Sequence, residues 1–131
     1  MADLNPALVP LSLYIHMPWC VRKCPYCDFN SHAVPDGKLS LALEESYLQA
    51  LVADFKTQLD FAQGRQIHSV FIGGGTPSLI SAQGYQWLFA ELKQLIVFEP
   101  NCEITLEANP GTLEHDPFIG YLQAGINRLS I

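Results

Sequence analysis

The sequence is poor in charged residues, and above all in positive charge. Lys and Arg number seven against thirteen Asp and Glu, which gives a formal charge of −6. No basic stripe or cluster could neutralise a phosphate backbone, so we expect no nucleic-acid partner. Charged residues make up 15% of the chain and hydrophobic residues 49%, a balance that excludes a disordered or low-complexity protein.

Long apolar runs and export signals are missing as well. No segment reaches the roughly 18 consecutive apolar residues of a membrane-spanning helix. Residues 1–5 lack the basic start and the apolar stretch of a signal peptide, so we expect a cytoplasmic protein. Cysteine is scarce, at four of 131 residues, yet three of the four fall within eight positions. In a reducing compartment such clustering predicts metal binding or redox chemistry.

What the chain does contain is an alternation of strand and helix patterns. Runs that alternate or are wholly apolar predict four strands, at 11–15, 70–72, 103–107 and 126–131. Apolar residues at helical spacing predict three helices, over 44–62, 81–96 and 118–125. Ser81 is the expected N-cap of the second helix and Gly125 the expected C-cap of the third. Residues 34–38 are predicted to form a loop.

Strict alternation of strand and helix predicts an α/β fold with a parallel sheet, either as an open layer or as a barrel. The last strand pattern runs to Ile131, with no closing helix after it. This pattern leaves a parallel edge unpaired and a sheet face uncovered. We therefore expect residues 1–131 to be the N-terminal part of a longer domain.

The cysteine motif occupies residues 20–27 (CVRKCPYC). Three cysteines on a short loop can hold a four-iron cluster and leave one iron open to a ligand that is not protein. Zinc would need a fourth ligand from elsewhere, for which His16 or His32 is available, and this alternative stays open. So does a purely structural or redox role of the thiols. The remaining cysteine, Cys102, is expected to be buried apolar filler without a role.

A glycine loop, residues 73–77 (Gly-Gly-Gly-Thr-Pro), follows the second predicted strand. No Gly-Lys-Ser/Thr follows it, and Ser78 stands where a dinucleotide fingerprint needs its third glycine, so the ATP and NAD interpretations lose support. A tight turn alone would explain the glycines. Beside a cysteine motif at the end of the preceding strand, however, they favour a loop whose backbone approaches a ligand.

Four segments together resemble the radical S-adenosylmethionine superfamily, and within it the branch of oxygen-independent coproporphyrinogen III oxidase and the haem chaperone HemW. They are residues 14–27, 73–77, 107–111 and 125–130. The resemblance implies a partial, TIM-like (β/α)6 barrel followed by a smaller C-terminal domain. Residues 1–131 would then supply three βα units and the fourth strand, and the remainder would be absent.

The resemblance also implies the site. Cys20, Cys24 and Cys27 would hold a 4Fe-4S cluster whose open iron binds S-adenosylmethionine, which the reduced cluster would cleave to start radical chemistry. The residues implied around that cofactor are Tyr14, Tyr26, Gly74, Gly75, Thr76 and Glu107. Three alternatives stay open: Tyr14 could simply pack in the barrel, Glu107 could cap a loop with its carboxylate, and His16 could have a structural role.

One position distinguishes the two members of this branch. The resemblance places a fourth cysteine two residues beyond the third in the oxidase, where this chain has Phe29. This favours the haem chaperone, which binds haem and delivers it to respiratory haemoproteins, over the oxidase, which decarboxylates coproporphyrinogen III to protoporphyrinogen IX. A non-catalytic zinc-binding fragment is the third alternative. The implied partners are haem or porphyrin and an electron donor, and we expect residues 1–131 alone to be inactive.

Overall fold

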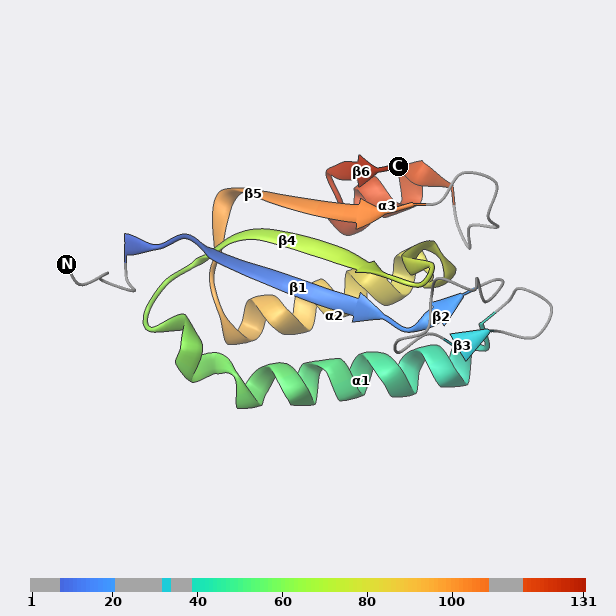
Figure 1. The fold of residues 1–131 in the computed structure, drawn as a ribbon, viewed down its shortest axis with the longest axis horizontal. Coiled ribbons are helices and arrows are strands. Elements are labelled where there is room, and N and C mark those ends of the chain that lie inside the picture. Colours follow the sequence, from blue (N-terminus) through green and yellow to red (C-terminus); the bar gives the residue numbers. More distant parts are fainter. Residues whose placement is uncertain (1–7, 21–31, 34–38, 109–116) are drawn as a thin grey trace.

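The computed structural model describes residues 8–20, 32–33, 39–108 and 117–131. Its main feature is a four-stranded sheet in the spatial order β1-β4-β5-β6, with every pair parallel. The strands are β1 (Leu11–Met17), β4 (Ile67–Gly74), β5 (Phe98–Glu107) and β6 (Arg128–Ser130). Short strands β2 (Trp19–Cys20) and β3 (His32–Ala33) pair separately. The predicted parallel α/β arrangement is confirmed (Figure 1).

In the part of the chain that the structure describes, three helices connect the strands of this sheet. They are α1 (Leu41–Thr57), α2 (Ala82–Leu95) and α3 (Phe118–Ala124), with 3-10 turns η3 (Leu59–Ala62) and η4 (Pro77–Leu79). In Figure 1, α2 lies behind the strands and α1 runs below β1; among the described residues, no helix lies in front of the strands, and we call this front face the open face. Among the helices of the described residues, none is long and apolar enough to cross a membrane.

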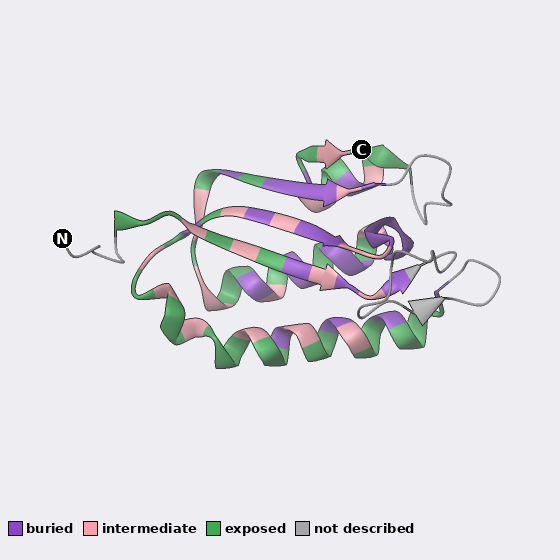
Figure 2. Ribbon diagram, viewed as in Figure 1, coloured by how far each residue is buried: buried purple, intermediate pink, exposed green. Residues whose placement is uncertain are grey.

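Alternation along the strands separates the two faces of the sheet. Ile15, Met17, Val70 and Ile72 are buried toward the helices. The residues between them, such as Tyr14, are half-buried or exposed on the open face, which gives the alternating colours of Figure 2. The pattern therefore places the hydrophobic core between the sheet and its helices.

Several element ends differ from the sequence-based expectation. The helix predicted over 44–62 ends at Thr57, since the chain tightens into η3 and then turns through Gln63 and Gly64, both with positive φ. Ile96 is extended and is not the last residue of α2. β5 begins five residues earlier than expected, at Phe98, and β6 is shorter than 126–131. The loop predicted at 34–38 lies outside the described residues.

Two predicted helix caps are confirmed. The Ser81 hydroxyl accepts a hydrogen bond from the Gly84 N–H at 2.9 Å, which satisfies a donor at the start of α2. Gly125 ends α3 with φ +118°, and its N–H donates to Leu122 at 3.1 Å. The Ser81 cap fixes where α2 begins after β4, and the Gly125 cap fixes where α3 ends before β6.

Candidate functional site

The glycine loop leaves the carboxyl end of β4, where no side chain would fit. Gly74 has φ +109°, and a Cβ on it would collide with the carbonyl oxygen of Met17. A Cβ on Gly73 would lie 2.9 Å from the Phe71 ring and 3.2 Å from the Tyr14 hydroxyl. Glycine is therefore required at Gly74 by its backbone conformation and by the Met17 carbonyl group, whereas a side chain at Gly73 would displace the rings of Phe71 and Tyr14.

The loop is tied to the chain that enters the cysteine motif. The Gly75 N–H donates to the carbonyl oxygen of Met17 and the Thr76 N–H to that of Trp19, both at 2.7 Å. Trp19 immediately precedes Cys20, so these bonds hold the glycine loop beside the start of the cysteine motif. These bonds engage the N–H donors of Gly75 and Thr76, so neither N–H points to a ligand in this conformation.

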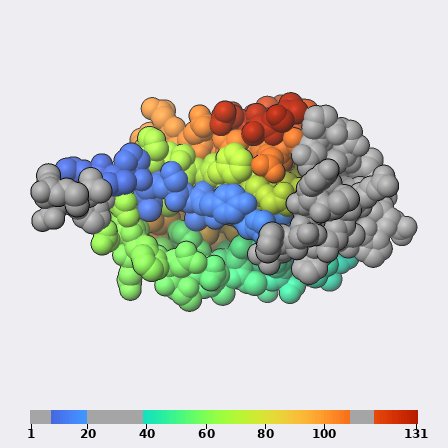
Figure 3. All heavy atoms as spheres, in the orientation of Figure 1, coloured from blue at the N-terminus to red at the C-terminus, as the bar shows by residue number. Residues whose placement is uncertain are grey.

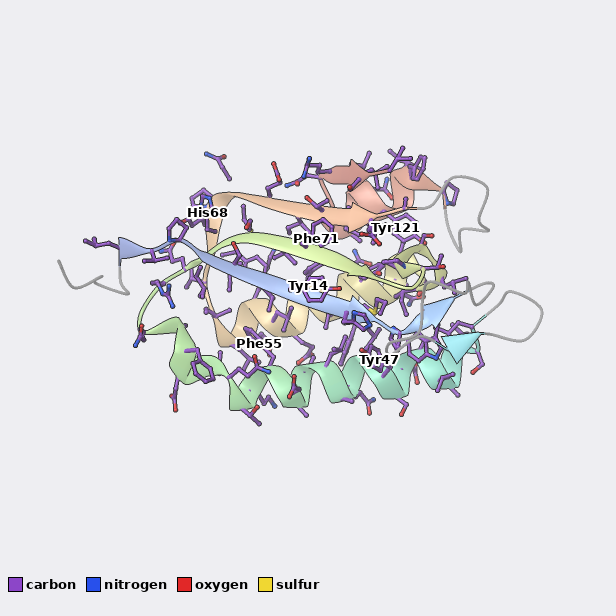
Figure 4. All side chains as sticks on the ribbon, in the orientation of Figure 1. Tyr14, Tyr47, Phe55, His68, Phe71 and Tyr121 are labelled. Atoms are coloured by element: carbon purple, nitrogen blue, oxygen red, sulfur yellow. The ribbon has the colours of Figure 1, made fainter. Side chains whose placement is uncertain are left out.

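Tyr14 lies on the open face of the sheet, next to this loop. Its ring stacks on Phe71, the residue opposite it on β4, with centroids 6.2 Å apart and planes at 15°. Its hydroxyl is 3.0 Å from Nδ1 of His16. The side chain is 57% exposed, and Figure 4 shows it in the middle of this face. Partial burial of the side chain raises the pKa of the Tyr14 phenol, and the charge of Glu107 raises it further. The phenol therefore stays protonated at neutral pH.

Glu107 is the last residue of β5 and is half-buried. It stands opposite Ser130 on β6, whose carbonyl oxygen accepts the N–H of Ala108 at 2.8 Å. The four main-sheet arrowheads point to the same end in Figure 1, so Glu107 and the glycine loop share the carboxyl edge of a parallel sheet. Ligands bind at this edge in α/β proteins.

Two aromatic residues contribute to this region without having been predicted to do so. Tyr47 of α1 donates its hydroxyl to the carbonyl oxygen of His16 and meets the ring of Trp19 edge-on, with centroids 4.6 Å apart. Phe71 forms the stack with Tyr14. Both are ordinary members of apolar patterns in the sequence, and only strand pairing and helix placement reveal their contacts.

Part of the predicted site falls outside what the structure describes. Cys24, Tyr26, Cys27 and Phe29 lie outside the described residues, and only the backbone of Cys20, paired with Ala33, is described. Within 8–20, 32–33, 39–108 and 117–131, no group of three His, Cys, Asp or Glu could hold a metal. Of the predicted cofactor residues, the structure thus brings together Tyr14, Gly74, Gly75, Thr76 and Glu107.

Cys102 lies on β5, away from this edge. It is buried, and burial raises the pKa of its thiol, as does the charge of Glu99, while Lys93 lowers it. A thiol held in its protonated form is a poor nucleophile and a poor metal ligand.

The comparisons with known proteins agree with this geometry. Residues 14–131 match the Radical SAM superfamily. The chain is 55% identical to the haem chaperone HemW of Haemophilus influenzae over 96% of its length, and 51% identical to that of Escherichia coli over 95%. The Bos taurus mitochondrial protein named radical S-adenosyl methionine domain-containing protein 1 is 38% identical over 92% of the chain and is itself covered to 26%.

Among solved structures, coproporphyrinogen III oxidase (HemN) from Escherichia coli, described as a radical SAM enzyme, superimposes with a TM-score of 0.78 at 29% identity. The match covers 95% of this chain and 28% of the oxidase. The chain likewise spans 33% and 32% of the two HemW proteins, about a third of their length. Because the family match covers residues 14–131 and the fold agrees with that of the oxidase, this chain belongs to the radical S-adenosylmethionine superfamily.

Proposed function

We propose that this chain is part of a haem chaperone that carries a radical S-adenosylmethionine domain. The observation that carries the proposal is the 55% identity with the HemW protein of Haemophilus influenzae, which extends over 96% of this chain. The cargo would be haem, with respiratory haemoproteins as its recipients, as the resemblance implies. Because the chain covers only 33% of that relative, these properties would belong to the whole protein.

We infer that Cys20, Cys24 and Cys27 hold a 4Fe-4S cluster and that the carboxyl edge of the sheet holds S-adenosylmethionine. The described residues fit such a ligand. Glycines at the carboxyl end of β4 let backbone carbonyl groups come close to a ligand, and the Glu107 carboxylate adds negative charge at the same edge. Acceptors and a carboxylate suit the ammonium group and the sulfonium charge of S-adenosylmethionine.

When bound, the cluster and S-adenosylmethionine would supply radical chemistry that the protein's side chains cannot perform. The contribution of this chain is to bind and to orient. Gly74 and Gly75 would let the backbone approach the amino-acid end of the cofactor, and Tyr14 would place a neutral phenol and an aromatic ring beside it. The link from the loop to Trp19 would keep that end close to the cysteine motif.

Oxygen-independent coproporphyrinogen III oxidase is the second candidate. The structural likeness to the Escherichia coli enzyme, with a TM-score of 0.78, supports it. Two observations favour the chaperone. Identity to the oxidase is 29%, against 55% to HemW, and Phe29 stands where the resemblance places a fourth cysteine in the oxidase.

The experiment uses the protein at the full length of its relatives, purified and reconstituted anaerobically with iron and sulfide. We expect about four irons per chain with a broad brown absorption, and stoichiometric binding in a titration with haem. Incubation with reductant, S-adenosylmethionine and coproporphyrinogen III should yield no protoporphyrinogen. Conversion over many turnovers would make the protein an oxidase and overturn the chaperone assignment.

Cysteine variants provide the matched control for the cluster. Cys20→Ala, Cys24→Ala and Cys27→Ala should each lose most of the iron, whereas Cys102→Ala should retain it, because Cys102 lies on β5 with a protonated thiol. Full iron content in Cys24→Ala, or zinc bound in place of iron, would contradict the proposed centre.

A further inference from the structure

Two buried tyrosines contact the backbone at the last residue of the glycine loop and directly after it. Tyr85 of α2 is 0% exposed and donates its hydroxyl to the carbonyl oxygen of Pro77 at 2.6 Å. Tyr121 of α3 is 1% exposed, and its hydroxyl lies 2.7 Å from the carbonyl oxygen of Ser78 and 2.9 Å from that of Ile80. Hydroxyls from two different helices therefore converge on residues 77–80, with Tyr121 labelled in Figure 4.

The hydroxyl groups do what a phenylalanine ring could not. A ring alone would fill the same space, but a buried phenol costs free energy unless it is hydrogen-bonded. The rings meet edge-on at 5.9 Å. Burial, with Tyr121 and Glu44 nearby, raises the pKa of Tyr85 well above its usual value, which keeps its proton available for the bond to Pro77.

Residues 77–80 need such support, since they form only one short turn. Within it, the Leu79 N–H donates to Thr76 at 3.0 Å and the Ile80 N–H to Pro77 at 3.2 Å. A 3-10 turn of this length has weak hydrogen-bond geometry and little stability of its own. The tyrosine hydroxyls supply bonds from the helix layer, on the side of the loop that leads into α2.

The glycine loop is thus held at both ends. Before the turn, Gly75 and Thr76 are bonded to the carbonyl groups of Met17 and Trp19. After it, the two hydroxyls fix residues 77–80. We propose that Tyr85 and Tyr121 are positioning residues that hold the glycine loop in the conformation that binds the amino-acid end of S-adenosylmethionine. The identity of the ligand rests on the proposed function. The claim that the two tyrosines hold the loop rests on the structure alone.

The test compares Tyr85→Phe and Tyr121→Phe with the parent, in the cluster-loaded protein at the full length of its relatives. Hydrogen exchange should be about tenfold faster in residues 75–80 and unchanged in β5. The dissociation constant for S-adenosylmethionine, measured by anaerobic equilibrium dialysis, should rise about tenfold, which corresponds to about 1.4 kcal/mol. Iron content should stay at the parent level, because both tyrosine hydroxyls bond to the backbone of residues 77–80.

Val52→Ala provides the control for general destabilisation. Val52 is buried in α1, whereas the tyrosine bonds to residues 77–80 come from α2 and α3. Its truncation should therefore lower stability and leave affinity and loop exchange at the parent level. Parent-like affinity and parent-like loop exchange in both tyrosine variants would overturn the proposal, as would an equal loss of affinity in Val52→Ala. A parent that does not bind S-adenosylmethionine would instead refute the proposed function, while faster loop exchange in the tyrosine variants would still support their role in holding the loop.

Discussion

At the scale of single residues, Gly74 shows how close the backbone segments of the site are. Its φ of +109° is beyond the left-handed region that Asn or Asp tolerates, and the space for a Cβ is taken by the carbonyl oxygen of Met17. Gly64 also has a positive φ, at +80°, but nothing lies within 4 Å of a Cβ there. A side chain at Gly64 would therefore meet backbone strain alone, whereas one at Gly74 would meet both strain and a collision.

We predict that Gly74→Ala lowers the free energy of unfolding by about 3 kcal/mol or more, because strain and collision add. Gly64→Ala should cost about 1 kcal/mol, which is the strain alone. Urea unfolding of the full-length protein measures both values. Gly74→Ala should also weaken S-adenosylmethionine binding, and Gly64→Ala should not. Equal losses of stability in the two variants would mean that Met17 does not confine the loop.

Residue-level prediction from the sequence succeeded where a residue type is chemically unusual. Ser81 was predicted as a cap, and the structure confirms it. Three glycines in a row predicted a loop whose backbone approaches a ligand; the structure shows the crowding at Gly73 and Gly74, and the ligand stays a prediction. The contact of Tyr47 with His16 joins residues 31 positions apart. Such a contact depends on how α1 packs against β1, and local spacing carries no information on it.

At the scale of elements, the start of α2 depends on a residue of α1. Glu44 is buried, and its carboxylate accepts the Ser81 N–H at 2.6 Å and the Ser81 hydroxyl at 2.8 Å. The Ser81 hydroxyl in turn accepts the Gly84 N–H at 2.9 Å. The sequence placed Glu44 only at the start of the helix predicted over 44–62. Its partner lies 37 residues away, and the chain of hydrogen bonds couples α1 to α2.

We predict that Glu44→Ala lowers the free energy of unfolding by about 2 kcal/mol, because the buried Ser81 N–H loses its acceptor. Glu45→Ala is the matched control, since Glu45 is the next residue and is exposed. That change should stay within about 0.5 kcal/mol. Urea unfolding followed by circular dichroism compares the two, and similar values would show that the link from α1 to α2 contributes nothing.

The number, type and order of the main elements could be predicted, but their ends less well. Apolar periodicity predicts which face of α2 is buried. Along the helix predicted over 44–62, the same periodicity continues past Thr57, so it does not mark where α1 ends and the η3 turn begins. β5 includes Pro100 and Asn101, which are poor strand formers, so its first half carried no strand signal. The pairs β2 and β3 are too short to show a pattern.

At the scale of the whole molecule, the sheet presents one face to its helices and the other to solvent. Figure 3 shows β1, β4 and β5 at the surface in the middle of the open face. That face carries Tyr14 and Phe71 beside serine and threonine, a mixture that suits the lining of a ligand site better than a hydrophobic core. The glycine loop and Glu107 border it at the carboxyl edge.

A second surface is more apolar and lies at the end of the chain. Phe118, Ile119 and Leu122 of α3 are 43%, 61% and 55% exposed, and Ile131 beyond β6 is 84% exposed. Large apolar side chains exposed together on one helix favour contact with further protein. Relatives about three times as long have the chain to provide such contact.

We therefore predict that residues 1–131, produced alone, bind the dye ANS and associate as their concentration rises, whereas the full-length protein does neither. The double variant Ile119→Ser/Leu122→Ser should reduce both effects in the short chain, because it replaces two exposed apolar side chains of α3 with polar ones. Leu8→Ser is the control, since Leu8 is 80% exposed but stands at the opposite end of the sheet. Dye fluorescence and analytical ultracentrifugation report the outcome. A short chain that stays monomeric, binds no dye and unfolds cooperatively would show that the α3 surface needs no cover.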